Sequence, residues 1–218
     1  MDSSARVLTA FEHAFLLRLL SSIPGLYLSG GAALAVHLGH RRSLDLDLFA
    51  ADDAAFQAAR ASLPVVASGL GARMEILTDA PAFRRLLLTG PRGETLRVDL
   101  VRETEDRSGP PPGEIAGLRI DPPEEIVVNK LCAILGRSEL RDLVDLYFLD
   151  RAGYPPLAAL DHARRKDPGL TPGLLAWAIT QVPLDRLPDG LLAPVSLDEL
   201  GGFRARLVEA FERLSFPD

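Results

Sequence analysis

The spacing of hydrophobic positions changes from strand-like to helix-like along the chain. In the first half, short runs alternate between hydrophobic and polar residues with a period of two, which predicts β-strands, and segments with helical spacing lie among them. The predicted strands cover residues 26–29, 44–49, 72–77, 83–89 and 95–101, with predicted helices at 4–21, 31–39 and 52–62. The turn Pro91-Arg92-Gly93 predicts that the last two strands form a hairpin.

The second half of the chain begins after a segment rich in proline, residues 103–123, which predicts a long loop or a subdomain boundary. Helical spacing then dominates, and the predicted helices cover residues 124–135, 138–151, 155–164, 172–180 and 197–214. The pattern therefore predicts an α/β (α+β) fold. We expect residues 1–121 to form a mixed β-sheet flanked by helices, and residues 122–218 to form a helical region.

The strand at 44–49 carries two carboxylates on one face. Leu44, Leu46 and Leu48 share the other face, so Asp45 and Asp47 project together, about 7 Å apart along the chain. Such a pair suits a divalent cation with oxygen ligands, Mg²⁺ or Mn²⁺. The alternative is the solvated face of an edge strand.

A glycine pair precedes this strand and suits phosphate binding. Gly30 and Gly31 lie between a predicted strand and a predicted helix, where backbone N–H groups can point at a triphosphate. Arg41 and the hydroxyl of Ser43, just ahead of the aspartates, are candidates to contact the same phosphates. His37 and His40, near the end of the helix, are expected at the surface or as partners of the helix dipole, and not as ligands.

A third carboxylate is expected from the strand at 95–101, where Asp99 lies opposite Leu96, Val98 and Leu100. Asp99 could join the metal-binding pair, or it could simply face solvent. Three carboxylates on one face suit one or two Mg²⁺ ions, which leave coordination positions open for substrate phosphates. We predict Asp99 as the third metal ligand and as a catalytic carboxylate that could accept a proton.

A second polar cluster lies in the helical half of the chain. Lys130 is surrounded at helical spacing by apolar residues, so it is expected to be buried and to need an anionic partner. An internal ion pair with Asp142 or Asp145 would orient two helices, and the same lysine could contact a nucleotide. Arg141 lies beside these carboxylates.

Composition restricts the classes of function. The formal net charge is −6, which argues against uniform coating of nucleic acid, and Arg164, Arg165 and Lys166 form the best local basic patch. The single cysteine, Cys132, excludes an intramolecular disulfide and fits a reducing compartment. No hydrophobic stretch predicts a signal peptide or a membrane span, so a cytoplasmic location is expected.

Two motif regions together resemble the nucleotidyltransferase family of AbiEii/AbiGii toxins, a branch of the polymerase-β-type superfamily. They read GGAALAVHLGHRRSLDLDLF and NKLCAILGRSELRDLVDLYFL. The resemblance implies metal-dependent transfer of a nucleoside monophosphate from an NTP to an acceptor such as tRNA. It also implies a helical region that closes one side of the nucleotide cleft, and a cognate antitoxin as partner.

The resemblance also implies roles for individual residues. Asp45 and Asp47 match the metal-binding pair, Lys130 the nucleotide-contacting lysine, and Arg141, Asp142 and Asp145 the late Arg-Asp-x-x-Asp motif. Ala32 departs from the pattern, because relatives often carry a serine or threonine after the glycines. Two alternatives stay open: transfer to a small molecule with an aminoglycoside-like hydroxyl, and a degenerate fold that binds nucleotide or protein without chemistry.

Overall fold

The computed structural model describes residues 7–103, 107 and 109–215. Contacts between Cα atoms divide the chain into two compact units. The first unit comprises Met1–Asp106 and Pro111–Asp121, and the second comprises Arg107–Pro110 and Pro122–Asp218. The assignment of residues 1–121 and 122–218 to separate functional domains stays a prediction. No helix formed by the described residues is both long enough and apolar enough to cross a lipid bilayer.

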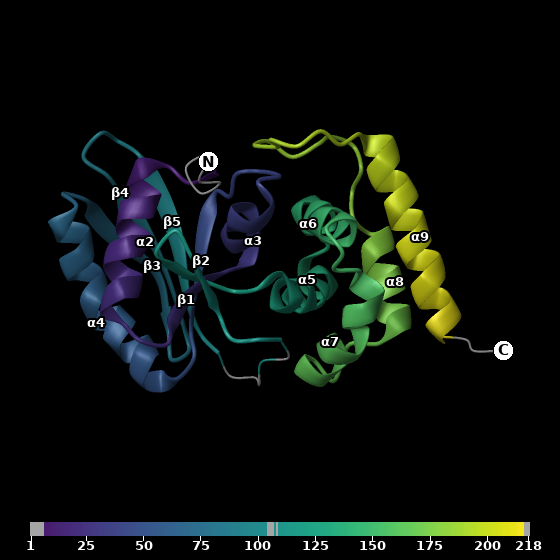
Figure 1. Ribbon diagram of the computed structural model, residues 1–218, viewed down its shortest axis with the longest axis horizontal. Coiled ribbons are helices and arrows are strands. Elements are labelled where there is room, and N and C mark those ends of the chain that lie inside the picture. Colours follow the sequence, from purple (N-terminus) through teal and green to yellow (C-terminus); the bar gives the residue numbers. More distant parts are fainter. Residues whose placement is uncertain (1–6, 104–106, 108, 216–218) are drawn as a thin grey trace. The chain divides into compact units, whose positions relative to one another are not determined.

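A mixed β-sheet forms the centre of the first unit (Figure 1). Within the described residues it has seven strands in the order β3-β4-β5-β2-β1-β7-β6. Their bounds are Leu26–Ser29 (β1), Asp45–Ala50 (β2), Arg73–Ala80 (β3), Phe83–Thr89 (β4), Thr95–Arg102 (β5), Gly113–Ile115 (β6) and Leu118–Ile120 (β7). The first five match the predicted strands closely, with the largest difference at β3, which is longer than expected.

Strand direction places the functional residues of the sheet. β2 pairs antiparallel with β1 and parallel with β5, and β5 pairs antiparallel with β4 through the predicted turn. Leu46 and Leu48 of β2 are fully buried, whereas Asp45 and Asp47 alternate with them on a partly exposed face. The alternative in which these aspartates lie on an edge strand is therefore wrong, because β2 has a neighbour on each side.

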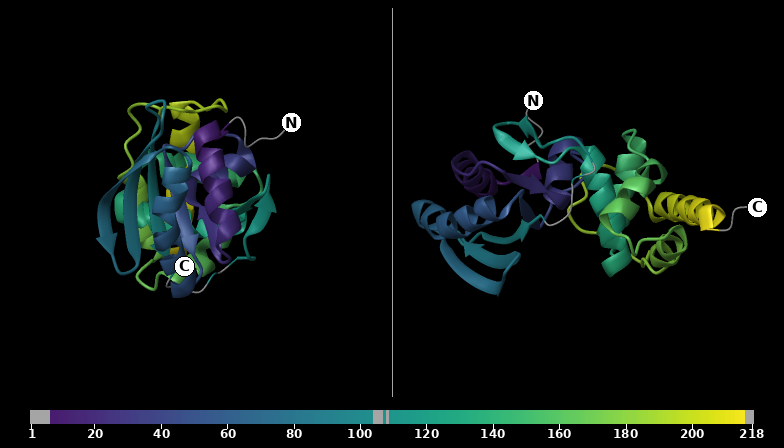
Figure 2. Two further views of the ribbon diagram at one scale, coloured as in Figure 1. Left: turned by 90° about the vertical axis from the view of Figure 1, so that its left-hand side faces the viewer. Right: turned by 90° about the horizontal axis from the view of Figure 1, so that it is seen from below.

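The predicted long loop at 103–123 is only partly irregular, and residues 104–106 and 108 of it lie outside the described residues. β6 and β7 form a short hairpin there, turned by Ala116 and Gly117, which both have a positive φ angle. β7 then pairs parallel with β1, so this hairpin makes one edge of the sheet while β3 makes the other (Figure 2). Strands of three residues are too short to show a period of two, which explains why the sequence did not predict them.

Three helices pack on the sheet, namely α2 (Ala10–Ser22), α3 (Gly30–Leu38) and α4 (Asp53–Gly69). α2 begins at a capping box in which the Thr9 hydroxyl accepts from the Glu12 N–H and the Glu12 carboxylate accepts from the Thr9 N–H. Within the described residues this start is later than predicted. α4 continues past its predicted end and through Pro64, because Leu63 and Ala67 on either side of it are buried against the core.

The second unit is helical, as predicted. It contains α5 (Pro123–Arg137), α6 (Leu140–Arg151), the 3₁₀ helix η1 (Pro156–Ala159), α7 (Leu160–Lys166), α8 (Pro172–Thr180) and α9 (Leu197–Ser215). α6 begins two residues later than predicted because Ser138 has a φ of 44° and ends α5 in the left-handed conformation. The predicted helix at 155–164 is split between η1 and α7.

Candidate active site

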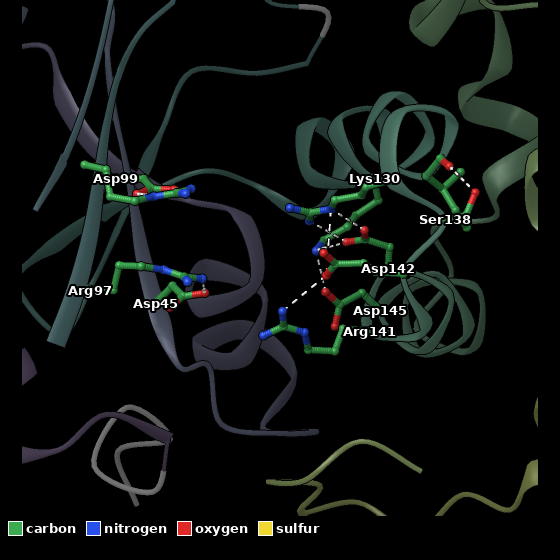
Figure 3. Close-up of polar contacts among 12 residues, drawn as sticks. Asp45, Arg97, Asp99, Lys130, Ser138, Arg141, Asp142 and Asp145 are labelled. Carbon is green, nitrogen blue, oxygen red and sulfur yellow. Dashed lines mark hydrogen bonds and ion pairs between the residues drawn. The ribbon is translucent and has the colours of Figure 1, made fainter. Parts of the chain in front are cut away.

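Three carboxylates lie on one face of two adjacent strands. The parallel register of β2 and β5 places Asp47 beside Asp99 and Asp45 beside Arg97. Side chains at paired positions of neighbouring strands share a face, so Asp45, Asp47 and Asp99 project from the same side of the sheet. Figure 3 shows Asp45, Arg97 and Asp99 on these neighbouring strands.

Arginines balance the charge on this face. The guanidinium of Arg85 donates to both oxygens of Asp99, from Nε to Oδ1 at 2.8 Å and from Nη2 to Oδ2 at 2.6 Å. Arg97 donates through Nη2 to Asp45 Oδ2. Only 8% of Asp99 is exposed, so the alternative in which Asp99 faces solvent is wrong. A bidentate pair fixes both partners in orientation as well as distance.

The pKa of Arg85 shows how closely the carboxylates are grouped around its guanidinium. The hydrogen bond from Arg85 to Asp99 raises the pKa of the guanidinium above its ordinary value, and the charges of Asp45 and Asp47 raise it further. Burial acts in the opposite direction and is outweighed. All three carboxylates therefore act on the same cation.

The donor set of this face partly fits a divalent metal. Asp45 and Asp47 offer only oxygen atoms, from alternate positions of one strand, which is the ligand chemistry that Mg²⁺ prefers. No three His, Cys, Asp or Glu side chains among the described residues are arranged to enclose an ion. Arg85 engages both oxygens of Asp99, which accounts for the lack of a third converging ligand. Asp45 and Asp47 have the ligand chemistry of a metal site, although Arg97 holds one oxygen of Asp45, and the metal with its three ligands stays a prediction.

The glycine turn lies directly against this carboxylate face. Gly30 has a φ of 62°, and a Cβ atom placed on it would lie 2.0 Å from Asp47 Oδ2. A Cβ atom on Gly31 would lie 2.3 Å from Arg41 Nη2 and 3.3 Å from Ser43 Oγ. Only glycine allows both approaches, because any side chain would displace these groups. The structure thus brings together the glycines, Arg41, Ser43 and Asp47, as the sequence predicted.

The helical unit contains the second predicted cluster. The ammonium group of Lys130 contacts Asp142 Oδ1 at 2.8 Å and Asp145 Oδ2 at 2.6 Å (Figure 3). The ion pair predicted with one or the other carboxylate is therefore confirmed, and it includes both. Arg137 adds two hydrogen bonds to Asp142, at 2.8 and 2.9 Å. The lysine and both aspartates are buried. Arg141 is about one-third exposed and contacts Glu139 at 3.2 Å.

Opposing effects act on the pKa of Asp142. Burial alone would raise it, but the charge of Lys130 and the hydrogen bonds from Arg137 and Lys130 lower it below its ordinary value. Asp142 therefore stays ionised at neutral pH inside the unit. A buried network of this kind fixes the relative orientation of α5 and α6, which carry its members.

Several buried polar groups were missed or misjudged from the sequence. His40 is fully buried, so a surface position for it is wrong, whereas His37 lies part-buried in the last turn of α3, where it contacts the backbone of Asp121. Lys166 lies 2.7 Å from the buried Glu125, which removes it from the predicted basic patch and leaves Arg164 and Arg165. The contacts of His37 and Lys166 could not be predicted from local pattern, because the partner of each is far away in the sequence.

Comparison with known proteins identifies related chains. A family model described as nucleotidyl transferase AbiEii toxin, type IV TA system, matches residues 15–216. No curated protein matches the chain.

Three solved structures share the fold. A candidate nucleotidyltransferase from H. pylori aligns with a TM-score of 0.59 at 21% identity over 94% of both chains. JHP933 from Helicobacter pylori aligns with a TM-score of 0.57 at 24% identity over 94% of this chain and 92% of that one. MenT4, a nucleotidyltransferase toxin from Mycobacterium tuberculosis H37Rv, aligns with a TM-score of 0.56 at 19% identity over 94% of this chain and 82% of that one. The predicted nucleotidyltransferase-type fold is therefore confirmed.

Proposed function

Because the chain belongs to the AbiEii family of nucleotidyltransferase toxins from type IV toxin–antitoxin systems, we propose that it transfers a nucleoside monophosphate from an NTP to RNA, with tRNA as the acceptor. The observation that carries the proposal is the register of β2 and β5, which aligns Asp47 with Asp99 while Gly30 lies against Asp47. A phosphate-binding turn and a carboxylate face in direct contact are the two parts that phosphoryl transfer requires.

The proposed reaction assigns a step to each group. Backbone N–H groups at Gly30 and Gly31, with Arg41 and Ser43, bind and orient the triphosphate. The acceptor oxygen forms a bond to the α-phosphorus, the bond from that phosphorus to the bridging oxygen breaks, and pyrophosphate leaves. The proton of the acceptor hydroxyl passes to Asp99, which requires Arg85 to release one of the two oxygens that it now holds.

A divalent ion fits the β2 carboxylates, and Asp45 and Asp47 would hold it, with Asp99 as the proposed third ligand. Bound there, Mg²⁺ or Mn²⁺ would neutralise charge on the triphosphate and on the departing pyrophosphate. In the helical unit, we propose that Lys130 contacts the nucleotide and that Asp142, Asp145 and Arg141 orient it. The proposal also includes a cognate antitoxin as partner and the cytoplasm as the place of action.

The test is transfer of label from each α-³²P-labelled NTP, with Mg²⁺, to total tRNA. Wild-type protein is compared with a D45A/D47A variant and with a D185A/D189A control, which removes two exposed carboxylates from the helical unit. We expect labelled RNA with the wild type and the control but not with D45A/D47A. Labelled RNA with D45A/D47A would refute the assigned role of the aspartates. Absence of label with every NTP would refute RNA as the acceptor and leave the small-molecule acceptor or the binding module.

A further inference from the structure

Asp121 contacts both ends of helix α3. Its carboxylate Oδ2 accepts a hydrogen bond from the Ser29 hydroxyl at 2.5 Å, and its backbone carbonyl accepts one from His37 Nε2 at 2.8 Å. Ser29 is the N-cap residue of α3, and His37 lies in the last turn of the same helix. Ser29 is fully buried and 1% of Asp121 is exposed, so water does not compete for the contact between their side chains.

The backbone of Asp121 adds a third connection. Its N–H donates to the carbonyl of Leu28 at 2.8 Å, beside the pairing of Leu28 with Ile120 that joins β1 to β7. Asp121 is thus fixed to the strand that leads into the glycine turn as well as to the helix that follows it. Asp121 therefore connects β1 and both ends of α3, and it is 92 residues away from Ser29 in the sequence.

The hydrogen bond from Ser29 to Asp121 also changes what the helix N-terminus can bind. A serine at an N-cap position ordinarily accepts a hydrogen bond from a backbone N–H of the first turn. In α3 the Ser29 side chain makes no such bond, and its hydroxyl donates to Asp121 instead. The N–H groups of the first turn are consequently not capped by this side chain and stay oriented toward an anion.

The same serine connects the turn to the carboxylate face. Ser29 pairs with Asp47 in the antiparallel register of β1 and β2, and Gly30 next to it lies against Asp47 Oδ2. A shift of Ser29 would therefore move the phosphate-binding turn relative to the metal-binding aspartate. The contacts run from Asp121 to Ser29 and from there to Gly30 and Asp47.

We propose that Asp121 is a positioning residue that orients the glycine turn for the triphosphate by engaging the Ser29 hydroxyl. The inference rests on the proposed function and deepens it by adding two residues that the motifs do not contain. Asp121 acts through Ser29 and does not touch substrate.

The experiment compares S29A, D121A, the double variant S29A/D121A, D121N and a control, D79A. Asp79 lies in the same unit on the edge strand β3 and pairs with Arg84 and Arg60, so D79A removes an equal charge without touching α3. Binding of each NTP with Mg²⁺ is measured by calorimetry on folded protein, together with KM and kcat. Amide hydrogen exchange at Gly30 and Gly31 is measured by NMR without nucleotide.

We expect S29A and D121A each to weaken NTP binding by about 10-fold to 100-fold, the range seen when the partner of a functional group is removed. The double variant should be no weaker than either single variant, because both remove the same hydrogen bond. D121N should stay within about threefold of wild type, since its amide oxygen still accepts from Ser29. Exchange at the two glycines should rise equally in S29A and D121A and stay unchanged in D79A.

Two results would overturn the inference. One is NTP affinity within twofold of wild type in folded S29A and D121A; the other is strictly additive losses in the double variant. If wild-type protein binds no NTP, the proposed function fails. The exchange rates then decide alone whether Asp121 orders the turn, and unchanged rates in both variants would overturn that role as well.

Discussion

Replacement of Lys130 by methionine should lower the free energy of unfolding of the helical unit by about 3–5 kcal/mol. The side chain of Lys130 is 6% exposed, and its two partners, Asp142 and Asp145, are 1% and 0% exposed. Removal of one partner from a buried pair leaves uncompensated charge in a medium of low polarity, and this loss costs about 3–5 kcal/mol. Arg137 still contacts Asp142 in this variant, so the charge of Asp142 stays partly compensated.

Urea denaturation measures this loss directly. The single tryptophan, Trp177, is 60% exposed on α8, so unfolding is followed by far-UV circular dichroism, which reports the helices that make up most of this unit. The matched control is R141M, which removes a cation whose partner Glu139 is 39% exposed and should cost less than about 1 kcal/mol. A K130M protein within 1 kcal/mol of wild type would refute the view that Lys130 is a buried structural cation. It would also allow any loss of activity in that variant to be assigned to nucleotide contact.

Three further changes test other parts of the structure. G30A should lower the melting temperature and the NTP affinity more than G39A does. Both glycines have a positive φ, but only at position 30 would a Cβ atom collide with Asp47. Equal losses of melting temperature in the two variants would contradict this. Burial raises the pKa of the Cys132 thiol to about 11, so iodoacetamide at pH 8 should alkylate this thiol far more slowly in native protein than in urea. Equal alkylation rates in the two conditions would contradict this prediction. Because the pKa of Asp142 is lowered in the folded state, its contribution to stability is present above about pH 4 and should be lost below, as followed by far-UV circular dichroism in urea titrations at each pH. A difference in stability between wild type and D142N that stays the same from about pH 7 to about pH 3 would contradict it.

The extent to which the sequence predicts this fold depends on how local each signal is. β1 and β4 match their predicted bounds because glycine or proline flanks them, and α8 matches because Thr171 caps it just before Pro172. The β6–β7 hairpin was missed because its strands have three residues each. A local pattern predicts a strand or helix only when the element is long enough for its hydrophobic spacing to repeat.

The candidate site also combines features that local sequence pattern predicts with contacts that it does not predict. Alternation within single segments predicts the face on which Asp47 and Asp99 each lie, but the pairing of β2 with β5 that brings them together is long-range. The pairing of Arg85 with Asp99 could also have been inferred, because the β4–β5 turn sets a register in which these two residues are opposite each other. No local signal pointed to Asp121. Its partner Ser29 is 92 residues away in the sequence, and the two meet only because β7 pairs with β1.

The parallel pairing of β2 with β5 has a kinetic consequence. Asp45 and its arginine partner on β5 are separated by 52 residues, so the pairing forms only after a long loop has closed. Contacts of this separation slow folding, whereas the β3–β4 and β4–β5 hairpins close locally. Asp45 and Asp47 can be in place on β2 before Asp99 arrives beside them. During synthesis, no emerging chain can complete the carboxylate face until β5 has left the ribosome.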